Sequence, residues 1–584
     1  MKKDINVVGL SLSHCATACL LQNGRIIGAV SEERFNRKKN CFGYPKLSLD
    51  YLLETAGIEG KDLDLVVLYG FAPLAIDSEE KYDFIYQIYD GLACFFNRFP
   101  FLKLPYDLLY GLVRPGYTHR WRQAVAGRLQ KELNLTREKI VCVDHHLCHA
   151  YAPLFGLLSA EQRKEKLLLF TNDGMGDDYC AAVNIFDKGR MNLVGRKTAN
   201  DHSLALVYTA VTKYLGMKTL EHEYKVMGLA PYADKIGQRK SYEVLQKLVW
   251  LNDDLSFGSK IAAPSYYYWL KDNLHFHRFD WIAGAIQQLT EELLTQWIKR
   301  GIEKTGIKKI VLGGGIFMNV KANMLIAELP EVQKLFIMPS ATDESTAIGA
   351  AFIGYQKKCQ EEKIFFDPHP LANLYLGPDY TEAEINQVLK KSECFSKYLV
   401  SKVKNIEKKI AELLAEGKIV ARFSGRMEWG ARALGNRSIL ADPRKLQTIK
   451  VINEQIKGRD FWMPFAPTIL YERQGEYLVN PQKMGAPFMV LAFETTPKGR
   501  EVLQAAIHPY DFTCRPQILK KEQNPKYYEM IKEFEKLTGV GAVLNTSFNL
   551  HGDPIICSPK DAMETFEKSG LKYLAMEDYL ISKK

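Results

Sequence analysis

An Asn-Gly pair, Asn23-Gly24, lies between two short apolar runs near the start of the chain and strongly constrains the local fold. Asn-Gly readily adopts the positive φ angles of a tight hairpin turn, so residues 16–21 and 25–30 are predicted to pair as antiparallel strands. The apolar run before them, residues 6–12, is predicted to be a further strand. The chain therefore opens with a three-stranded meander.

Strand-like and helical patterns alternate after this meander. Residues 281–298 repeat apolar side chains at helical spacing and are predicted to form a helix. A meander followed by such alternation is typical of an actin-like nucleotide-binding fold, so an α/β domain is predicted. The further predicted strands are residues 63–68, 140–143, 166–171 and 309–312.

Length and a proline-containing break predict two domains. A chain of 584 residues exceeds what one hydrophobic core usually supports. Residues 366–370 read Phe-Asp-Pro-His-Pro, which interrupts regular structure, and a helical pattern at 406–416 and an apolar run at 418–423 restart an α/β pattern. We therefore predict domains at residues 1–365 and 375–584, with no internal sequence repeat.

Composition limits the expected partners. The net charge of +10 is spread along the chain without a long basic block, so no nucleic-acid partner is expected, whereas small anions would suit local arginine clusters. The 11 cysteines form no CxxC pair and are expected to be reduced, in a cytoplasmic protein. Charges and prolines interrupt the aromatic stretch 84–112, so a packed helical insertion is predicted there and no membrane span.

Two histidines four residues apart, His145 and His149, are the strongest functional signal. In a helix they lie on one face, so both imidazoles can reach one divalent metal. A carboxylate is expected to complete the site, and Asp343 follows an apolar run, where a strand end could present a ligand. The alternative is that either histidine caps a helix or lies hydrogen-bonded in the core.

Two glycine-containing turns follow predicted strands. Asp173 lies in the run Asn-Asp-Gly-Met-Gly-Asp-Asp, where aspartates can hold a metal-bound water or a ligand hydroxyl, although a hairpin turn would also use Asp-Gly. The triple glycine 313–315, followed by Asn319, can cradle a nucleotide, although an ordinary tight turn would have the same sequence.

The C-terminal part concentrates cations beside glycine, proline and aromatic residues, at 429–438 and 457–465, and Arg515 can join them. Guanidinium groups bind phosphate and carboxylate oxygens in a bidentate manner, and a lysine adds a point charge. Solvated surface charge is the alternative. Residues 544–549 are dense in short hydrogen-bonding side chains, which suit a polar substrate or a helix cap.

Taken together, these runs resemble the NodU/CmcH family of O-carbamoyltransferases over nearly the full length. The resemblance implies an actin-like (ASKHA) N-terminal domain similar to the tRNA threonylcarbamoyl transferases and a C-terminal YrdC-like α/β domain. Family members use carbamoyl phosphate and ATP to make carbamoyl-adenylate and pass the carbamoyl group to a hydroxyl of a small natural product. The motifs that carry it are residues 13–18, 32–39, 144–150, 223–232, 314–319, 430–443 and 457–467.

The resemblance also implies roles for individual residues. His14 would be the general base, since imidazole titrates near neutrality, with Lys39 and Asp173 as further catalytic residues. Iron(II) or another divalent metal would be held by His145, His149 and Asp343, as a Lewis acid. The co-substrates, with Mg²⁺ expected beside the ATP, would be bound by Gly313, Gly314, Gly315, Asn319, Arg432, Arg437, Ser438, Lys457, Arg459, Arg515 and Asn545. Two positions depart from the family pattern: Ala431 replaces a proline, and Met463 replaces an arginine.

Two rival functions remain open at this point. A tRNA-modifying enzyme of the threonylcarbamoyl type would combine the same two halves, but the chain has no arginine-rich arm. A non-catalytic ATP- and metal-binding module would not need both the histidine pair and the cations. The acceptor is not identified. Residues 84–112 and the aromatic segment 266–269, continuing to 275–277, are expected to wall its pocket, with Tyr267, Tyr268 and Trp269 in contact with the acceptor. Helix packing or a subunit contact is the alternative. A homodimer is one expected assembly.

Overall fold

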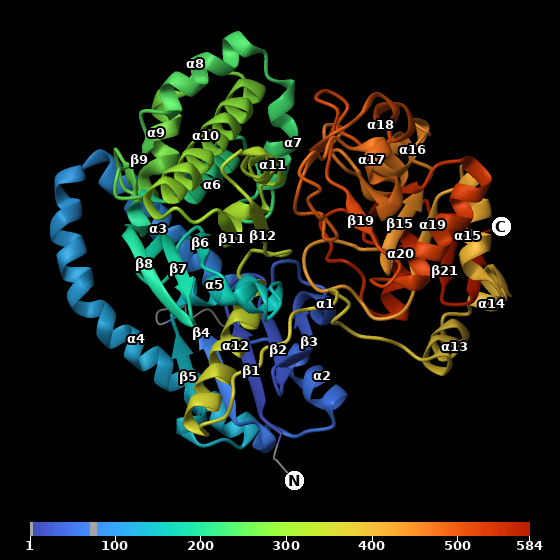
Figure 1. Ribbon diagram of the computed structural model, residues 1–584, viewed down its shortest axis with the longest axis horizontal. Helices are drawn as coiled ribbons and strands as arrows, with labels where there is room; N and C mark the ends of the chain where they lie inside the picture. The colour runs from blue at the N-terminus through green and yellow to red at the C-terminus, as the bar shows by residue number, and fades with distance from the viewer. Residues whose placement is uncertain (1–3, 71–78, 584) are drawn as a thin grey trace. The chain divides into compact units, whose positions relative to one another are not determined.

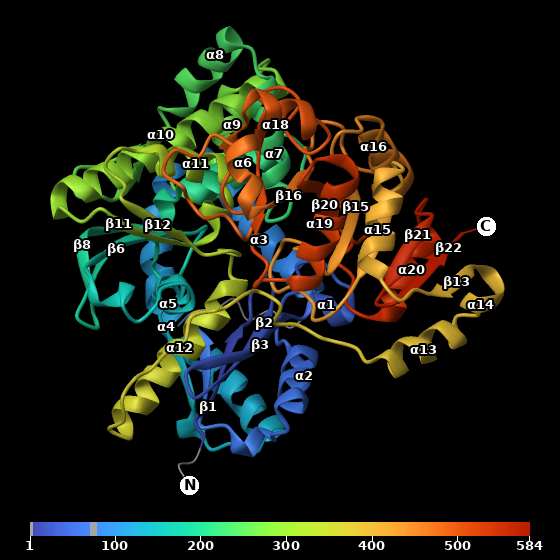
Figure 2. The ribbon, with the colours of Figure 1, turned by 45° about the vertical axis from the view of Figure 1, so that its right-hand side comes forward.

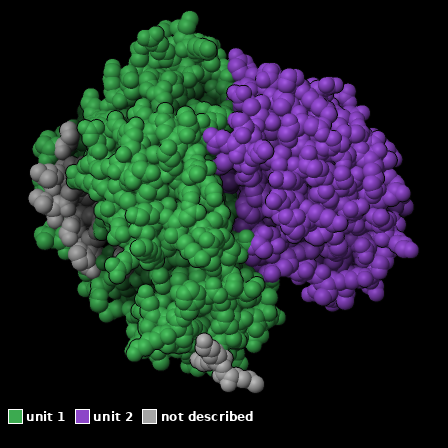
Figure 3. All heavy atoms as spheres, viewed as in Figure 1, with its two compact units in different colours: residues 1–32, 40–371 green, residues 33–39, 372–584 purple. Residues whose placement is uncertain are grey.

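The computed structural model describes residues 4–70 and 79–583, and the chain divides into two compact units (Figure 3). Unit 1 comprises Met1–Glu32 and Asn40–Leu371, and unit 2 comprises Glu33–Lys39 and Ala372–Lys584. The segment Glu33–Lys39 thus belongs to the C-terminal unit although it lies early in the sequence. The predicted domains, with one boundary between residues 365 and 375, placed this segment in the N-terminal domain instead.

Unit 1 begins with the predicted meander. Strands β1 (Asn6–Ser11), β2 (Thr17–Gln22) and β3 (Arg25–Ser31) pair antiparallel, and Asn23 and Gly24 have φ angles of 48° and 81° in the turn. The predicted strands at 63–68 and 140–143 are also confirmed, as β4 (Leu65–Tyr69) and β5 (Ile140–Val143). They extend the sheet in parallel, in the order β3-β2-β1-β4-β5.

A second sheet of unit 1 repeats this strand order. Its central strand β6 (Leu167–Asn172) pairs antiparallel with β7 (Tyr179–Asp187), which pairs with β8 (Arg190–Ala199). On its other side β6 is parallel to β11 (Lys309–Gly313), which is followed by β12 (Lys334–Ile337). The order β8-β7-β6-β11-β12 has the same directions as the first sheet. The repeat is therefore topological, with no repeat in the sequence.

Helices pack around both sheets of unit 1 (Figure 1). The predicted helix at 281–298 is confirmed as α10, and the stretch 84–112 falls in the helices α3 and α4. None of the described helices combines the length and apolar composition that a bilayer crossing needs. The helices of this unit are α2 (Lys46–Ala56), α3 (Glu79–Arg98), α4 (Lys103–Leu133), α5 (His145–Gly156), α6 (Leu204–Tyr214), α7 (Glu223–Leu229), α8 (Lys235–Leu245), α9 (Tyr266–Asn273), α10 (Phe279–Thr305), α11 (Val320–Glu328) and α12 (Glu344–Glu361), with a small hairpin of β9 (Val249–Leu251) and β10 (Phe257–Ser259).

Helix α12 packs against β1 and α5, and its place beside β1 is visible in Figures 1 and 2. Small residues allow this close approach. A Cβ on Gly349 would lie 2.0 Å from the carbonyl oxygen of Cys148 on α5. Because that atom is backbone, a side chain at this position would push the two helices apart. The N-terminus of α12 is therefore held next to the start of α5.

Unit 2 is built on one mixed sheet of order β13-β22-β21-β14-β15-β20-β16-β19. Its core includes Phe423, Ile439, Leu544 and Phe566, and helices α15 (Ile406–Ala415) and α19 (Pro525–Thr538) pack together. The helix and strand predicted at 406–416 and 418–423 are confirmed as α15 and β14. The strands are β13 (Leu399–Lys402), β14 (Val420–Phe423), β15 (Arg437–Ala441), β16 (Ala466–Leu470), β19 (Gln517–Leu519), β20 (Ala542–Ser547), β21 (Tyr573–Met576) and β22 (Tyr579–Ser582).

Helices and short segments complete unit 2. They are α1 (Glu33–Asn36), α13 (Glu382–Lys391), α14 (Cys394–Lys397), α15 (Ile406–Ala415), α16 (Gln447–Lys450), a π-helical turn (Val451–Lys457), α17 (Gln474–Tyr477), α18 (Pro497–Val502), α19 (Pro525–Thr538) and α20 (Pro559–Lys568), with a short pair of β17 (Phe493–Glu494) and β18 (Thr513–Cys514). Both units mix helices with sheets, as an α/β protein is expected to do.

The close contact between α12 and α5 generates a stability prediction. We expect Gly349→Ala to destabilise the protein by about 1–3 kcal/mol, because the added methyl group meets backbone rather than a flexible side chain. Gly91→Ala in α3 is the matched control, since nothing lies within 4 Å of its Cβ position. Urea unfolding checks this, and equal midpoints for the two variants would contradict it.

Candidate functional site

Helix α5 places His145 and His149 on one face, as predicted. Asp144 begins the helix, and its carboxylate accepts a hydrogen bond from Leu147 N at 2.8 Å. The helix cap is therefore Asp144, and neither histidine. The two Nε2 atoms lie 3.0 Å apart, and both imidazoles are buried. Imidazole nitrogens this close need a shared proton or a shared cation between them.

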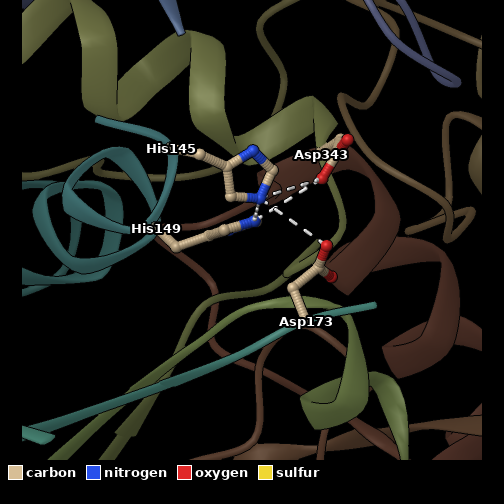
Figure 4. Close-up of side chains that lie close together, drawn as sticks. All are labelled: His145, His149, Asp173 and Asp343. Carbon is tan, nitrogen blue, oxygen red and sulfur yellow. Dashed lines mark hydrogen bonds and ion pairs between the residues drawn. The ribbon is translucent and has the colours of Figure 1, made fainter. Parts of the chain in front are cut away.

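Two carboxylates face the histidine pair (Figure 4). Asp343 Oδ1 lies 3.7 Å from His145 Nε2 and 3.5 Å from His149 Nε2, and Asp173 Oδ2 lies 3.6 Å from His145 Nε2. One donor atom from each of the four residues lies within 4.8 Å of the others. Asp173 follows β6. Asp343 precedes the first residue of α12, six residues after β12 ends, so the expectation of a strand end for this residue is wrong.

Burial and neighbouring charges shift the pKa values of Asp343 and His145 in opposite directions. Burial would raise the pKa of Asp343, but His14, His145 and His149 hold it well below its usual range. Burial also lowers the pKa of His145, and the carboxylates Asp343 and Asp173 outweigh it, raising the pKa to about 9. The protein thus stabilises positive charge between these side chains.

The donor set fits a divalent metal. Within the described part of the chain, the buried Asp343 Oδ1 has no hydrogen-bond partner although it faces two imidazole nitrogens. Two imidazoles and two carboxylates are ligands that iron(II), zinc and similar ions accept. A cation between them would satisfy Oδ1 and both Nε2 atoms.

Neighbouring groups orient the four side chains. Ser345 Oγ donates to Thr342 O at 2.9 Å, so at 3.3 Å from His149 Nδ1 it accepts the Nδ1 proton. In this neutral tautomer the electron pair of His149 is on Nε2, where a cation shared with Asp343 would accept it. Ser13 Oγ donates to Asp343 Oδ2, and His14 Nδ1 lies 3.6 Å from the same oxygen. Hydrogen bonds of this kind, from neighbouring groups to metal-binding side chains, fix the orientation of those side chains.

The triple glycine packs against this cluster. A Cβ on Gly313 would lie 2.1 Å from His149 O, and Gly314 has a φ of 102°. Gly315 N donates to Asp173 Oδ1 at 2.7 Å. Asn319 caps α11 through Ala322 N and exchanges hydrogen bonds with Gln287. These contacts account for the turn as support for the four side chains, and nucleotide binding there stays a prediction.

Unit 2 holds a separate group of cations. Lys457 is buried, and its Nζ donates to Ser547 Oγ at 3.0 Å and Asn549 Oδ1 at 2.9 Å. Burial, then Arg459 and Lys39, hold the pKa of Lys457 well below its usual range. Lys39, predicted as a catalytic residue together with His14 and Asp173, belongs to unit 2 and lies close enough to Lys457 to repel it. Its catalytic role stays a prediction.

Arg515 belongs to the same group of cations. Its pKa is lowered by burial and by its neighbours Arg432 and Arg459. Positive charges that repel one another inside a protein are stabilised when an anion binds among them. We name Lys39, Arg432, Lys457, Arg459 and Arg515 the cation cluster.

The other predicted co-substrate residues are engaged elsewhere in unit 2. Arg437 is wholly buried and donates to the carbonyl oxygens of Ser424 and Gly425, both at 3.0 Å. Ser438 Oγ accepts from Gly435 N at 3.0 Å, and Asn545 Nδ2 donates to Ala433 O at 3.1 Å. These bonds tie the 424–438 loop to the sheet, and a role in co-substrate binding stays a prediction.

Glu428 was missed at the sequence level. It is buried, and its Oε1 accepts from the backbone N–H groups of Leu434, Asn436 and Arg437, at 2.8, 2.8 and 3.1 Å. A lone acidic residue before Trp429-Gly430 was the available signal.

Of the two positions that depart from the family pattern, Met463 is buried and Ala431 is exposed.

The aromatic run of α9 is tied to neighbouring helices. Tyr268 OH donates to Asp90 Oδ2 at 3.1 Å, and Lys213 Nζ lies 4.4 Å from the centre of the Tyr267 ring. These contacts favour helix packing. Contact of Tyr267, Tyr268 or Trp269 with an acceptor stays a prediction, and many side chains of 84–112 lie outside the described residues.

Comparisons with known proteins agree with this two-part organisation. The family profile described as carbamoyltransferase N-terminus matches residues 6–352, and carbamoyltransferase C-terminus matches residues 411–583. An uncharacterized Synechocystis protein is 31% identical over 99% of this chain and 97% of its own. Nodulation protein NolNO of Sinorhizobium fredii is 30% identical over 98% of this chain and 79% of its own. The protein is a carbamoyl-transferring enzyme. It belongs to the carbamoyltransferase family.

The similarity of this chain to solved structures is low. Component A of the Acidaminococcus fermentans (R)-2-hydroxyglutaryl-CoA dehydratase aligns over 60% of this chain and 98% of its own, with 14% identity and a TM-score of 0.33. A score this low does not establish a shared fold.

We predict that His149→Ala loses bound metal while the protein stays folded, because the imidazole donates an electron pair that alanine lacks. His146→Gln is the matched control, since His146 is adjacent on α5 but outside the four-residue cluster. Elemental analysis after loading with iron(II) under nitrogen measures the result. Equal metal content in both variants would contradict the assignment of His149.

Proposed function

We propose that this enzyme uses ATP and carbamoyl phosphate to form carbamoyl-adenylate and transfers the carbamoyl group to a hydroxyl of a small natural product. In the activation step water would release phosphate from carbamoyl phosphate, and the carbamate oxygen would attack the α-phosphorus of ATP and displace pyrophosphate. Family membership supports carbamoyl transfer. The observation that carries the finer proposal is the cation cluster, because an activation step that handles several phosphate groups needs concentrated positive charge. Activation is therefore assigned to unit 2, which adds Glu33–Lys39 to the domain predicted at 375–584.

Transfer is assigned to the domain at 1–365. The hydroxyl oxygen of the acceptor would attack the carbamoyl carbon, the bond from that carbon to the adenylate oxygen would break, and AMP would leave. His14 is the proposed base that takes the hydroxyl proton, with Asp343 3.6 Å from its Nδ1 to stabilise the imidazolium. Iron(II) or another divalent metal at His145, His149 and Asp343 would supply Lewis-acid stabilisation of the carbamoyl oxygen.

We propose an actin-like fold for unit 1 and a YrdC-like fold for unit 2. The strand order β3-β2-β1-β4-β5, which the second sheet repeats as β8-β7-β6-β11-β12, supports the first, since it begins with the meander that the resemblance to actin-like domains led us to expect. Nucleotide binding at 313–315 and Asn319 rests on the family resemblance. Mg²⁺ with the ATP, a cytoplasmic location and a homodimer are further parts of this proposal.

The two halves should separate by mutation. We expect Lys457→Ala to abolish carbamoyl phosphate-dependent release of pyrophosphate from ATP, since it removes the buried cation of the cluster. Lys450→Ala, on the exposed surface of α16, is its control. His14→Ala should keep pyrophosphate release and lose at least about 100-fold in transfer, the usual contribution of a general base. The measurements are a pyrophosphate assay and mass spectrometry of the product.

Two results would refute this division of labour. One is equal loss of both steps in His14→Ala. The other is pyrophosphate release that Lys457→Ala leaves unchanged. A mobility shift of tRNA at physiological salt would instead favour the tRNA-modifying alternative.

A further inference from the structure

The segment Glu33–Lys39 is built into unit 2. Arg34 Nη2 donates to Gly430 O at 2.9 Å, and the Phe35 side chain packs against a small apolar cluster that includes Met427 and Ile555. The segment therefore contacts the 424–438 loop and the region after β20. Its position is fixed by backbone carbonyls and by apolar contact together.

Arg37 contacts three groups of unit 2. Its Nη1 donates to Ile555 O at 2.7 Å and its Nη2 to Pro554 O at 2.9 Å, while Nε lies 4.0 Å from Asp561 Oδ1. Asp561 in turn accepts from Ser558 N at 2.8 Å. The planar guanidinium thus joins two successive carbonyl groups to a carboxylate in the first turn of α20.

A chain of hydrogen bonds connects the residues that Arg37 contacts to Lys457. Asp553, the neighbour of Pro554, accepts a hydrogen bond at its carbonyl oxygen from Asn549 Nδ2 at 2.6 Å. A carbonyl can only accept, so this bond fixes the amide with Nδ2 toward Asp553. Asn549 Oδ1 is then the atom that faces Lys457 Nζ, at 2.9 Å.

We propose that Arg37 is a positioning residue of the anion site in unit 2, which acts through Asp553 and Asn549 to aim the Lys457 ammonium at a bound phosphate group. The identity of that phosphate, carbamoyl phosphate or ATP, rests on the proposed function. The segment Glu33–Lys39 would then complete the anion site of unit 2, although it comes from the N-terminal part of the sequence.

Charge supports the same conclusion. Lys39, two residues after Arg37, is one of the two cations that lower the pKa of Lys457. The segment thus brings a positive charge to the cluster as well as an anchor for the 549–555 turn. Both effects serve the binding of an anion.

The test is a double-mutant cycle in the full-length protein. Arg37→Ala and Asn549→Ala are each expected to weaken binding of inorganic pyrophosphate, measured by calorimetry, and to raise the KM for carbamoyl phosphate, both by about tenfold. The double variant is expected to be no worse than about twofold beyond either single variant, because both changes break one path. Lys38→Ala, which removes an exposed cation of the same segment, is the matched control.

Arg37→Lys keeps the charge and the stem of the side chain but cannot donate to both carbonyls in the same way, so it is expected to show part of the loss. This variant decides the question if Arg37→Ala fails to fold. Multiplicative losses in the double variant, or an Arg37 variant that matches Lys38→Ala, would overturn the proposal. Wild-type protein that does not bind pyrophosphate would also overturn it.

Failure of the proposed function gives a different result. Wild-type protein would then bind pyrophosphate but release none from ATP and carbamoyl phosphate. In that case the calorimetric cycle of Arg37 and Asn549 still decides whether Arg37 positions the anion site.

Discussion

The structure of unit 1 depends on one buried carboxylate. Asp343 lies among His14, His145 and His149, in an environment where an isolated negative charge would be strongly disfavoured. The imidazoles offset that cost only if α5 and α12 stay in close contact, which the absence of a side chain at Gly349 allows. Packing of small residues and charge pairing are therefore two aspects of one arrangement.

The two units favour bound ions of opposite charge. Unit 1 gathers carboxylates and imidazoles, which together favour a bound cation. Unit 2 gathers cations whose pKa values are lowered by burial and by one another, which favours a bound anion. Family membership establishes carbamoyl transfer. The proposed two-step reaction would use the anion site for activation and the cation site for transfer.

Much of this could be predicted from local sequence. The hairpin at Asn23-Gly24 and the helical face that carries His145 and His149 follow from turn chemistry and helical spacing. Asp343 was chosen as their partner because a strand end was expected there; it does lie beside them, but at the start of α12. The place of Lys39 in unit 2 could not be predicted, because nothing in a local pattern shows that a short segment packs on the other unit. The same holds for Glu428, whose importance comes from three backbone N–H groups that only the folded loop brings together.

The most direct test of the central claim is anomalous diffraction from crystals of the protein grown with iron(II) under nitrogen. We predict a single strong peak at the iron edge within coordination distance, about 2.0–2.3 Å, of the Nε2 atoms of His145 and His149 and of an Asp343 oxygen. Asp173 is expected as a further ligand or as the acceptor of a bound water. No peak there, with the two Nε2 atoms still in contact, would contradict the account.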